Sequence, residues 1–427
     1  MKIEIRNGRL IDPARRIDRA GSLFIDDGRI VGDVEPPPGF RADRVVDAAG
    51  SVVSPGFVDL AARLREPGLE YKATLESELA AAGAGGVTSL ACPPDTDPPL
   101  DEPGLVEMLK HRARQIGISH VYPVGALTVG LRGAALTEMG ELVEAGCVAF
   151  SQADVPFHDT LMLLRALQYA GTFGYRVWLR PQDPYLAQDG VAHDGEVATR
   201  LGLPAIPVAA ETAALAKIFG LVRASGVGVH LCRLSSADGV AMLRSAKAEG
   251  LPVTCDVDIH HLHLCDVDIG WFDPLANLMP PLRGVRDRAA LRQAVADGTI
   301  DAICSDHAPV DDDVKQVPFA EAESGATGLE LLLPLTLKWA REDKVPLVDA
   351  LSRITTIPAA IIGLAAPSLA AGSIADVCIF DPEVPWVVRR DALASQGKNT
   401  PFLGHELEGR VCMTLRDGRI VHEPAQP

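Results

Sequence analysis

The sequence has no long apolar run and comparatively few basic residues. No stretch approaches the ~18 uninterrupted apolar residues of a membrane-spanning helix, and the start, Met1 to Arg6, lacks the apolar core of a signal peptide. The 40 Lys and Arg are outnumbered by 57 Asp and Glu, which gives a net charge of −17. So acidic a surface repels phosphate backbones and anionic lipids. We therefore expect a cytoplasmic protein that binds neither nucleic acid nor membranes.

Motifs that pair cysteines or bind dinucleotides are also missing. The eight cysteines are scattered, without a Cys-x-x-Cys pair, so we expect reduced thiols that are buried in the core. No Gly-x-Gly-x-x-Gly follows a predicted strand, which makes a doubly wound open sheet the less favoured fold class.

Both ends of the 427-residue chain contain short strands of alternating apolar residues. We expect these ends, residues 1–52 and 366–427, to pair into one small β-sandwich domain. The strand-like runs are Ile3 to Ile11, Ser22 to Ile25, Arg29 to Val31, Ala375 to Asp381, Arg410 to Leu415 and Arg419 to Val421.

The middle of the chain, residues 53–365, alternates short apolar strands with Ala- and Leu-rich helices about eight times. Near-continuous apolar strands between amphipathic helices are typical of parallel sheets with both faces covered. The fold class that we predict is therefore α/β, a (β/α)₈ TIM-type barrel. In such a barrel the reacting groups lie at the C-terminal ends of the strands, so the polar residues just after each apolar run bear on function.

Several of these strand ends carry recognisable motifs, and together they resemble dihydroorotase of the amidohydrolase superfamily over essentially the whole chain. The motifs are Pro55-Gly56-Phe57-Val58-Asp59, Leu64-Arg65-Glu66-Pro67-Gly68, Pro280-Pro281-Leu282-Arg283, Ser305-Asp306-His307-Ala308-Pro309 and Gly397-Lys398-Asn399-Thr400-Pro401-Phe402.

The resemblance implies a two-metal hydrolase, whose zinc ions need imidazole or carboxylate donors to activate water. Here the ligand positions are degenerate, and of the reacting groups only the aspartate that would activate the metal-bound hydroxide, Asp306, is retained. Asp154 lies one or two residues beyond the expected bridging carboxylate. The degenerate positions are Ala61 and Arg63 for the first two histidines, Gln152 and Ala153 for the bridging carboxylate, and Arg180 and Arg233 for the last two histidines.

The substrate contacts that the resemblance implies are equally altered. Arg65, which would bind the substrate carboxylate in a bidentate pair, is retained. Asp95 and Met279 stand where the family has asparagines, and Val310 replaces a histidine. We expect these positions to be vestigial.

We therefore predict a catalytically inactive relative of dihydroorotase without a zinc cofactor. The resemblance further implies a role in pyrimidine biosynthesis, as the non-catalytic subunit of a hetero-oligomer with the catalytic chain of aspartate carbamoyltransferase. Two alternatives stay open. One is a metal-dependent cyclic amidohydrolase, converting dihydroorotate and water to N-carbamoyl-aspartate, with Asp306, Asp154 and the histidines from His260 to His263 around one metal. The other is a sensor whose arginines hold an anionic metabolite.

Three arginines at inward-pointing positions would repel one another unless anions lie among them. We expect Arg63, Arg180 and Arg233 to converge and to be neutralised by Asp306 and Asp59, with Asp183 or a small bound anion completing the balance. Structural roles are expected for five of the eleven histidines, which are His230, His260, His261, His263 and His307.

Overall fold

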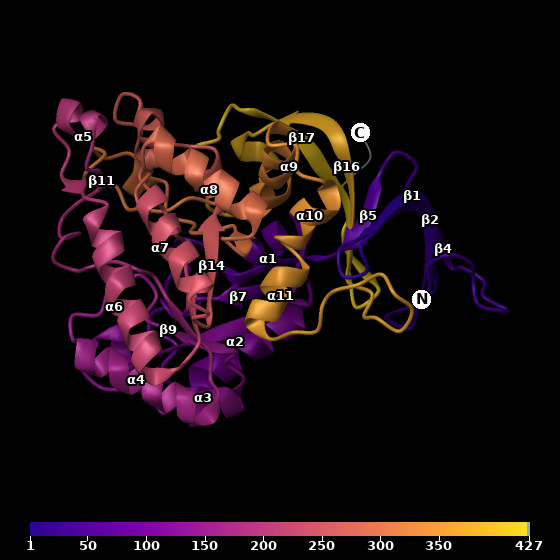
Figure 1. Ribbon diagram of the computed structural model, residues 1–427. Helices are drawn as coiled ribbons and strands as arrows, with labels where there is room; N and C mark the ends of the chain where they lie inside the picture. The colour runs from indigo at the N-terminus through magenta and orange to yellow at the C-terminus, as the bar shows by residue number, and fades with distance from the viewer. Residues whose placement is uncertain (425–427) are drawn as a thin grey trace.

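Two β systems organise the computed structural model, which describes residues 1–424 (Figure 1). The chain begins and ends in an eight-stranded sheet at one side of the molecule, and the middle forms an eight-stranded parallel sheet surrounded by helices. This confirms the predicted α/β class with a TIM-type barrel.

The terminal sheet joins the two ends of the chain, as predicted. Strand β5 pairs in parallel with β1 and antiparallel with β16, so it connects the N-terminal strands to the C-terminal ones. Because β5 extends to Pro55, this sheet reaches three residues beyond the predicted boundary at residue 52. Its strands are β1 (Ile3–Asp12), β2 (Ile17–Asp26), β3 (Arg29–Gly32), β4 (Arg44–Asp47), β5 (Val52–Pro55), β16 (Val377–Val387), β17 (Glu406–Arg416) and β18 (Arg419–His422).

The barrel strands follow one another around the sheet in chain order. They are short and buried because both faces are covered, by side chains inside and helices outside. The strands are β6 (Phe57–Asp59), β7 (Val87–Cys92), β8 (His120–Ala126), β9 (Ala149–Ser151), β10 (Val177–Leu179), β13 (Val229–Leu231), β14 (Val253–Asp258) and β15 (Ala302–Cys304).

Several helices on the outside of the barrel begin or end at capping residues. The side chain of Asp159 accepts hydrogen bonds at the N-terminus of α4, and glycines in the left-handed conformation, such as Gly174 and Gly226, end α4 and α6. The helices are α1 (Leu75–Ala84), α2 (Pro103–Ile116), α3 (Met139–Ala145), α4 (Thr160–Phe173), α5 (Glu196–Leu201), α6 (Ala209–Ser225), α7 (Ala237–Ala248), α8 (Val285–Asp297), α9 (Leu332–Glu342), α10 (Leu347–Ser352) and α11 (Thr356–Ile362).

The first and last barrel strands meet through side chains and the segments that follow them. Ser305 donates hydrogen bonds to Asp59 from its backbone N (2.7 Å) and its Oγ (2.5 Å). Beyond the strands, the backbone N of Arg63 donates to the carbonyl of His307 (2.9 Å). Asp59 is thus engaged in joining β6 to β15, and burial raises its pKa to about 6.

The described residues contain no disulfide, and six of the eight cysteines are buried. No helix among residues 1–424 is both long and apolar enough to cross a membrane.

Candidate functional site

Six charged residues meet at the C-terminal end of the barrel, each from a segment that follows a different strand. Backbone conformation directs several of them inward. Arg233 and Asp306 have positive φ angles of 57° and 40°, and Ala153, just before Asp154, has a φ of 49°. The six residues are Arg63 after β6, Asp95 after β7, Asp154 after β9, Arg180 after β10, Arg233 after β13 and Asp306 after β15.

Asp154 is the centre of this cluster. Its Oδ2 lies 2.7 Å from Nη2 of Arg63, and its Oδ1 lies 2.9 Å from Nε of Arg180 and also contacts Nη2 of Arg233. One carboxylate therefore binds all three arginines.

Asp306 and Asp95 complete the balance of charge. Oδ1 of Asp306 lies 2.8 Å from Nη1 of Arg63 and 2.8 Å from Nη1 of Arg233, while Asp95 accepts a hydrogen bond of 2.7 Å from Nε of Arg63. Three guanidinium groups thus face three carboxylates, and we call this set the Arg–Asp cluster.

The electrostatics of the cluster differ between its two most buried carboxylates. Burial would raise the pKa of Asp154, but Arg233, Arg63 and Arg180 outweigh it and hold that pKa far below the ordinary value. For Asp306, burial prevails over its two arginines, so its pKa is raised. Burial lowers the pKa of Arg180 to about 10, which still leaves it charged at neutral pH.

The prediction that the arginines converge and that at least one pairs with Asp306 is confirmed, but two of the predicted counter-ions are wrong. Asp59 binds Ser305 instead, and Asp183 accepts hydrogen bonds from the backbone of Tyr185 and Leu186. Their places are taken by Asp154 and Asp95. The sequence shows that Asp154 and Asp95 follow predicted barrel strands, which marks both as candidates. Residue spacing does not reveal which carboxylate each arginine reaches.

Little free space is left beside the cluster. The cavity lined by Arg63, Arg180 and Arg233 together with Trp178 and Cys232 has a volume of about 30 Å³. Small-molecule sites typically occupy ~300–1,000 Å³, and ~30 Å³ is about the volume of one water molecule.

The residues at the family's ligand positions do not fit a zinc ion. Arg63, Arg180 and Arg233 offer only donors, and Ala61 offers a methyl group. Gln152 is turned away, since its Oε1 accepts from Thr128 (2.9 Å) and its Nε2 donates to the carbonyl of Leu131 (2.6 Å). Ala153 is buried in a small apolar cluster.

Most ring nitrogens of these histidines bond to other groups, while Nε2 of His260 and Nδ1 of His263 are buried without a hydrogen-bond partner. The rings of His260 and His261 contact Asp258, and Nε2 of His263 donates to the carbonyl of Leu335 (2.9 Å). These residues do not join Asp306 and Asp154 in one site, which weighs against the predicted alternative of a single metal held by all of them. His230 contacts Thr254 and Asp256, and His307 contacts Glu78 and the backbone N of Gly328.

Two other groups among residues 1–424 have the composition of a metal site. His230, Cys232 and Asp256 lie close together beside the Arg–Asp cluster, and His120, Asp376 and Asp417 lie between the barrel and the terminal sheet. Both nitrogens of His230 are already hydrogen-bonded, and Asp256 accepts from the backbone N of Arg233 (2.6 Å).

The residues at the implied substrate contacts bind other parts of the protein. Nε of Arg65 donates to the carbonyl of Pro309 (2.8 Å), and Asp95 is paired with Arg63. Met279 packs beside Ala187, and Val310 is buried, with its backbone N donating to Asn399. The structure therefore pairs Asp95 with Arg63 in the Arg–Asp cluster, whereas Arg65 binds the backbone at Pro309 and Val310 lies outside the cluster.

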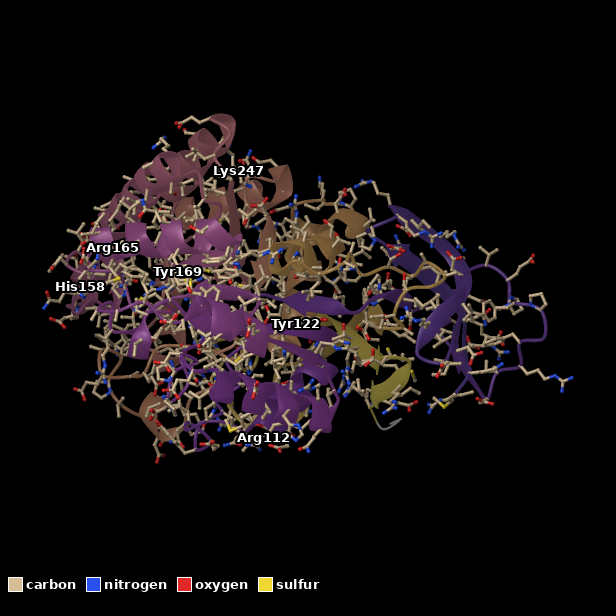
Figure 2. All side chains as sticks on the ribbon, turned by 90° about the horizontal axis from the view of Figure 1, so that it is seen from below. Arg112, Tyr122, His158, Arg165, Tyr169 and Lys247 are labelled. Carbon is tan, nitrogen blue, oxygen red and sulfur yellow. The ribbon has the colours of Figure 1, made fainter. Side chains whose placement is uncertain are left out.

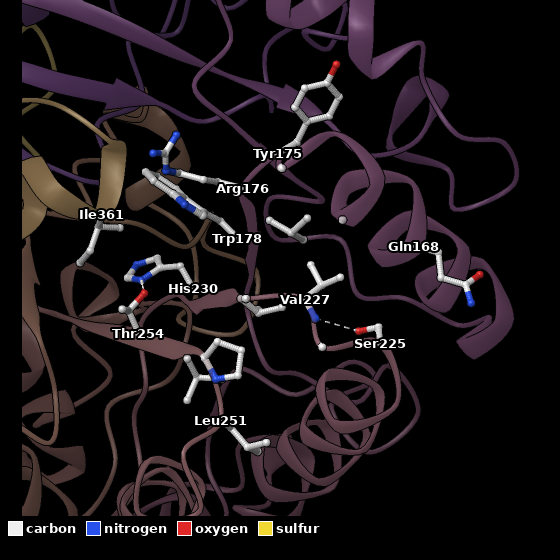
Figure 3. A pocket seen from close by; sticks show the side chains of 18 of the residues that line it. Gln168, Tyr175, Arg176, Trp178, Ser225, Val227, His230, Leu251, Thr254 and Ile361 are labelled. Atoms are coloured by element: carbon white, nitrogen blue, oxygen red, sulfur yellow. Dashed lines mark hydrogen bonds between the residues drawn. The ribbon is translucent and has the colours of Figure 1, made fainter.

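A larger hollow lies at the opposite end of the strands. This groove of about 990 Å³ is bordered by the ends of α4 and α6 and by the beginnings of β10, β13 and β14 (Figure 3). Trp178 lines both this groove and the 30 Å³ cavity. In Figure 3, His230 and Thr254 are hydrogen-bonded to each other at the inner wall of the groove. None of the three arginines of the cluster lines it.

The depressed pKa of Asp154 predicts a pH-dependent contribution to stability. In the unfolded chain this carboxyl would titrate near its ordinary pKa of ~3.9, so the unfolded state binds the proton first as the pH falls. The stabilisation by Asp154 is fully present above about pH 5 and declines below about pH 4. We expect the difference in unfolding free energy between wild type and Asp154→Asn to shrink between pH 6 and pH 2.5, measured by urea unfolding at each pH. A constant difference would contradict this assignment.

Comparisons with known proteins agree with the fold and the motifs. The model of the Dihydro-orotase-like family matches residues 50–239, and that of the Amidohydrolase family matches residues 177–422. A dihydroorotase-like protein of Pseudomonas aeruginosa is 46% identical over 99% of this chain and 100% of its own, and one of Pseudomonas putida is 44% identical over the same shares.

A third relative, a dihydroorotase of Geotalea daltonii, is 41% identical over 99% of this chain and all of its own. Among solved structures, L-hydantoinase from Arthrobacter aurescens superposes with a TM-score of 0.89 at 22% identity, covering 99% of this chain and 96% of that one. The barrel, the terminal sheet and the whole-length relatives together place this chain in the dihydroorotase-like family of the amidohydrolases.

Proposed function

We propose that this chain is a catalytically inactive member of the dihydroorotase family, which acts as the non-catalytic assembly subunit of an aspartate carbamoyltransferase complex. The observation that carries the first half of this proposal is the Arg–Asp cluster. Where a dihydroorotase would hold zinc and its hydroxide, Arg63, Arg180 and Arg233 are bound by Asp154, Asp306 and Asp95.

The chemistry of ring hydrolysis needs two things that this arrangement does not offer. A guanidinium has no lone pair with which to bind a metal, and without a metal, water retains a pKa of ~15.7 instead of ~7. Asp306 is also engaged with two arginines, so it is a poor candidate for a general base.

The two alternative functions have less support. An anion sensor needs unpaired cations, whereas the three arginines of the cluster are matched by carboxylates of the same chain. A hydrolase built on Asp306, Asp154 and the histidines from His260 to His263 needs these groups in one place. His260 and His261 instead contact Asp258, and His263 contacts Leu335.

The partner in this proposal rests on the resemblance to non-catalytic members of the dihydroorotase family. We expect the chain and the aspartate carbamoyltransferase catalytic chain of the same organism to co-purify as a stable hetero-oligomer, with a contact that buries well over ~1,000 Å². The measurement is light scattering after size exclusion at micromolar concentration, together with transferase activity with and without this chain. Separate elution of the two co-expressed proteins would refute the assembly role.

A further inference from the structure

Large apolar side chains are exposed at the same end of the barrel as the Arg–Asp cluster, and six of them lie on the segments that follow β9, β10 and β14. Trp271 is 87% exposed and Tyr185 is 72% exposed. Large side chains exposed in this way on adjoining loops are typical of interaction sites. We call this set the rim patch: Val155, Tyr185, Leu186, Val267, Trp271 and Phe272.

Contacts join the three segments that carry the rim patch. The ring of His158 packs edge-on against that of Tyr185, at 5.4 Å between centroids, so the segment after β9 adjoins the one after β10. Ala187 shares an apolar cluster with Met279, whose carbonyl accepts from Arg233 (3.4 Å). Met279, on the segment that leads from β14 to α8, therefore contacts both the segment after β10 and Arg233 of the Arg–Asp cluster.

The third contact joins the segment around β11 (Ala192–His193) to the one after β14. Nδ1 of His193 lies 3.3 Å from Nη1 of Arg283, and a Cβ on Gly195 would lie 3.5 Å from Oδ2 of Asp266. Figure 1 shows β11 and α5 at the end of the molecule away from the terminal sheet, and Figure 2 shows His158 at that same end.

The three segments that carry the rim patch are acidic. The three segments, residues 154–159, 183–196 and 266–275, contain no lysine or arginine. They expose six carboxylates, which belong to Asp159, Asp189, Asp194, Glu196, Asp268 and Asp273.

An apolar centre with an acidic border restricts what can cover it. Nucleic acid and anionic membranes would be repelled, and a second copy docked by the same face would bring like charges together. A different protein with an apolar centre bordered by Arg and Lys would be complementary in both respects.

We infer that the rim patch is the surface through which this chain docks on a partner protein with a basic, apolar-centred face. The inference rests on the proposed function, in which that partner is the catalytic chain of aspartate carbamoyltransferase. On this view the mouth of the barrel, closed by the Arg–Asp cluster, faces the partner. Exposed aromatic residues near the centre of an interface commonly carry much of the binding energy, so Trp271 and Tyr185 are the expected anchors.

The test measures binding of the purified aspartate carbamoyltransferase catalytic chain to immobilised full-length variants of this chain. We expect Trp271→Glu and Tyr185→Glu each to weaken binding by about 100-fold, within the range for interface anchors. Phe173→Glu is the matched control, because Phe173 is also exposed, at 59%, but ends α4 at the opposite end of the barrel. This control should bind within about threefold of wild type, a change of less than ~0.7 kcal/mol.

Charge and fluorescence give two further readouts on the same complex. Asp268→Lys combined with Asp273→Lys should slow association by about tenfold at low salt, and the loss should diminish at high salt. Trp271 is the most exposed of the four tryptophans, so acrylamide quenching should fall when the partner binds. Thermal unfolding of each variant establishes that it is folded.

The outcomes separate this inference from the proposed function. If wild type binds and the rim-patch variants bind equally well, the docking surface is wrong while the assembly role stands. Loss of binding in Phe173→Glu alone would place the interface at the opposite end of the barrel and would also overturn the inference. If wild type itself does not bind, the assembly role and the docking surface both fail.

Discussion

Purified wild-type chain is expected to contain less than about 0.1 zinc per molecule and to show dihydroorotase turnover at least ~10⁴-fold below that of a zinc-containing dihydroorotase assayed in parallel. The reason is chemical: Arg63, Arg180 and Arg233 supply no metal ligand, and their guanidinium groups occupy the place with their own carboxylate partners. Elemental analysis and a dihydroorotate hydrolysis assay on the same preparation measure both quantities. Two zinc ions per chain, or turnover sensitive to chelators, would contradict the proposal.

Two variants sharpen this experiment. Ala61→His combined with Arg63→His restores the first two histidines, yet it should remain inactive because Arg180 and Arg233 still stand at the other ligand positions, and because ligating histidines also need hydrogen-bond partners that orient their rings. Zinc bound to His230, Cys232 and Asp256 would also raise the measured zinc content, although these residues are not at the family's ligand positions. If the wild type binds zinc and Cys232→Ser does not, the metal lies in that neighbouring cluster.

The second large effect is expected on stability. Asp306→Ala should lower the free energy of unfolding by about 3–5 kcal/mol, the usual cost of removing one partner from a buried ion pair. The side chain of Asp306 is 9% exposed, and its loss leaves Arg63 and Arg233 sharing Asp154. Urea unfolding at pH 7 measures the change. A variant as stable as wild type would show that Asp306 does not hold the arginines together.

Two further variants serve as controls, one for the backbone conformation of Asp306 and one for the loss of a carboxylate from a surface ion pair. The φ of Asp306 is 40°, a conformation that asparagine tolerates better than alanine, so Asp306→Asn isolates the loss of charge. Asp312→Ala removes a carboxylate that pairs with Arg390 at the surface, where both side chains are 51% exposed. This control should cost less than about 1 kcal/mol.

A double-mutant cycle tests whether the loss comes from the ion pair itself. Arg233→Met combined with Asp306→Ala removes both partners, so the double variant should be destabilised by less than the sum of the two single ones. Strict additivity would mean that Arg233 and Asp306 contribute independently.

The sequence by itself determined the architecture and the degeneracy of the site. Apolar runs such as Val87 to Ala91 and Val253 to Val257 became barrel strands, because short strands buried on both faces leave a local pattern in the residue order. The resemblance to the dihydroorotase family likewise implied that Arg63, Arg180 and Arg233 stand at ligand positions, and residues that follow the strands of a parallel barrel must gather at one end.

Only the tertiary structure decided how the charges pair and what the barrel mouth presents to solvent. Asp59 was one of the expected counter-ions but lies where β6 meets β15, whereas Asp154 reaches all three arginines after the turn at Ala153. Such pairings depend on the direction in which each loop leaves its strand, and on distances between segments up to 243 residues apart. The rim patch also depends on the tertiary structure, because exposed side chains from separate loops come to lie at one end of the barrel only when the barrel closes.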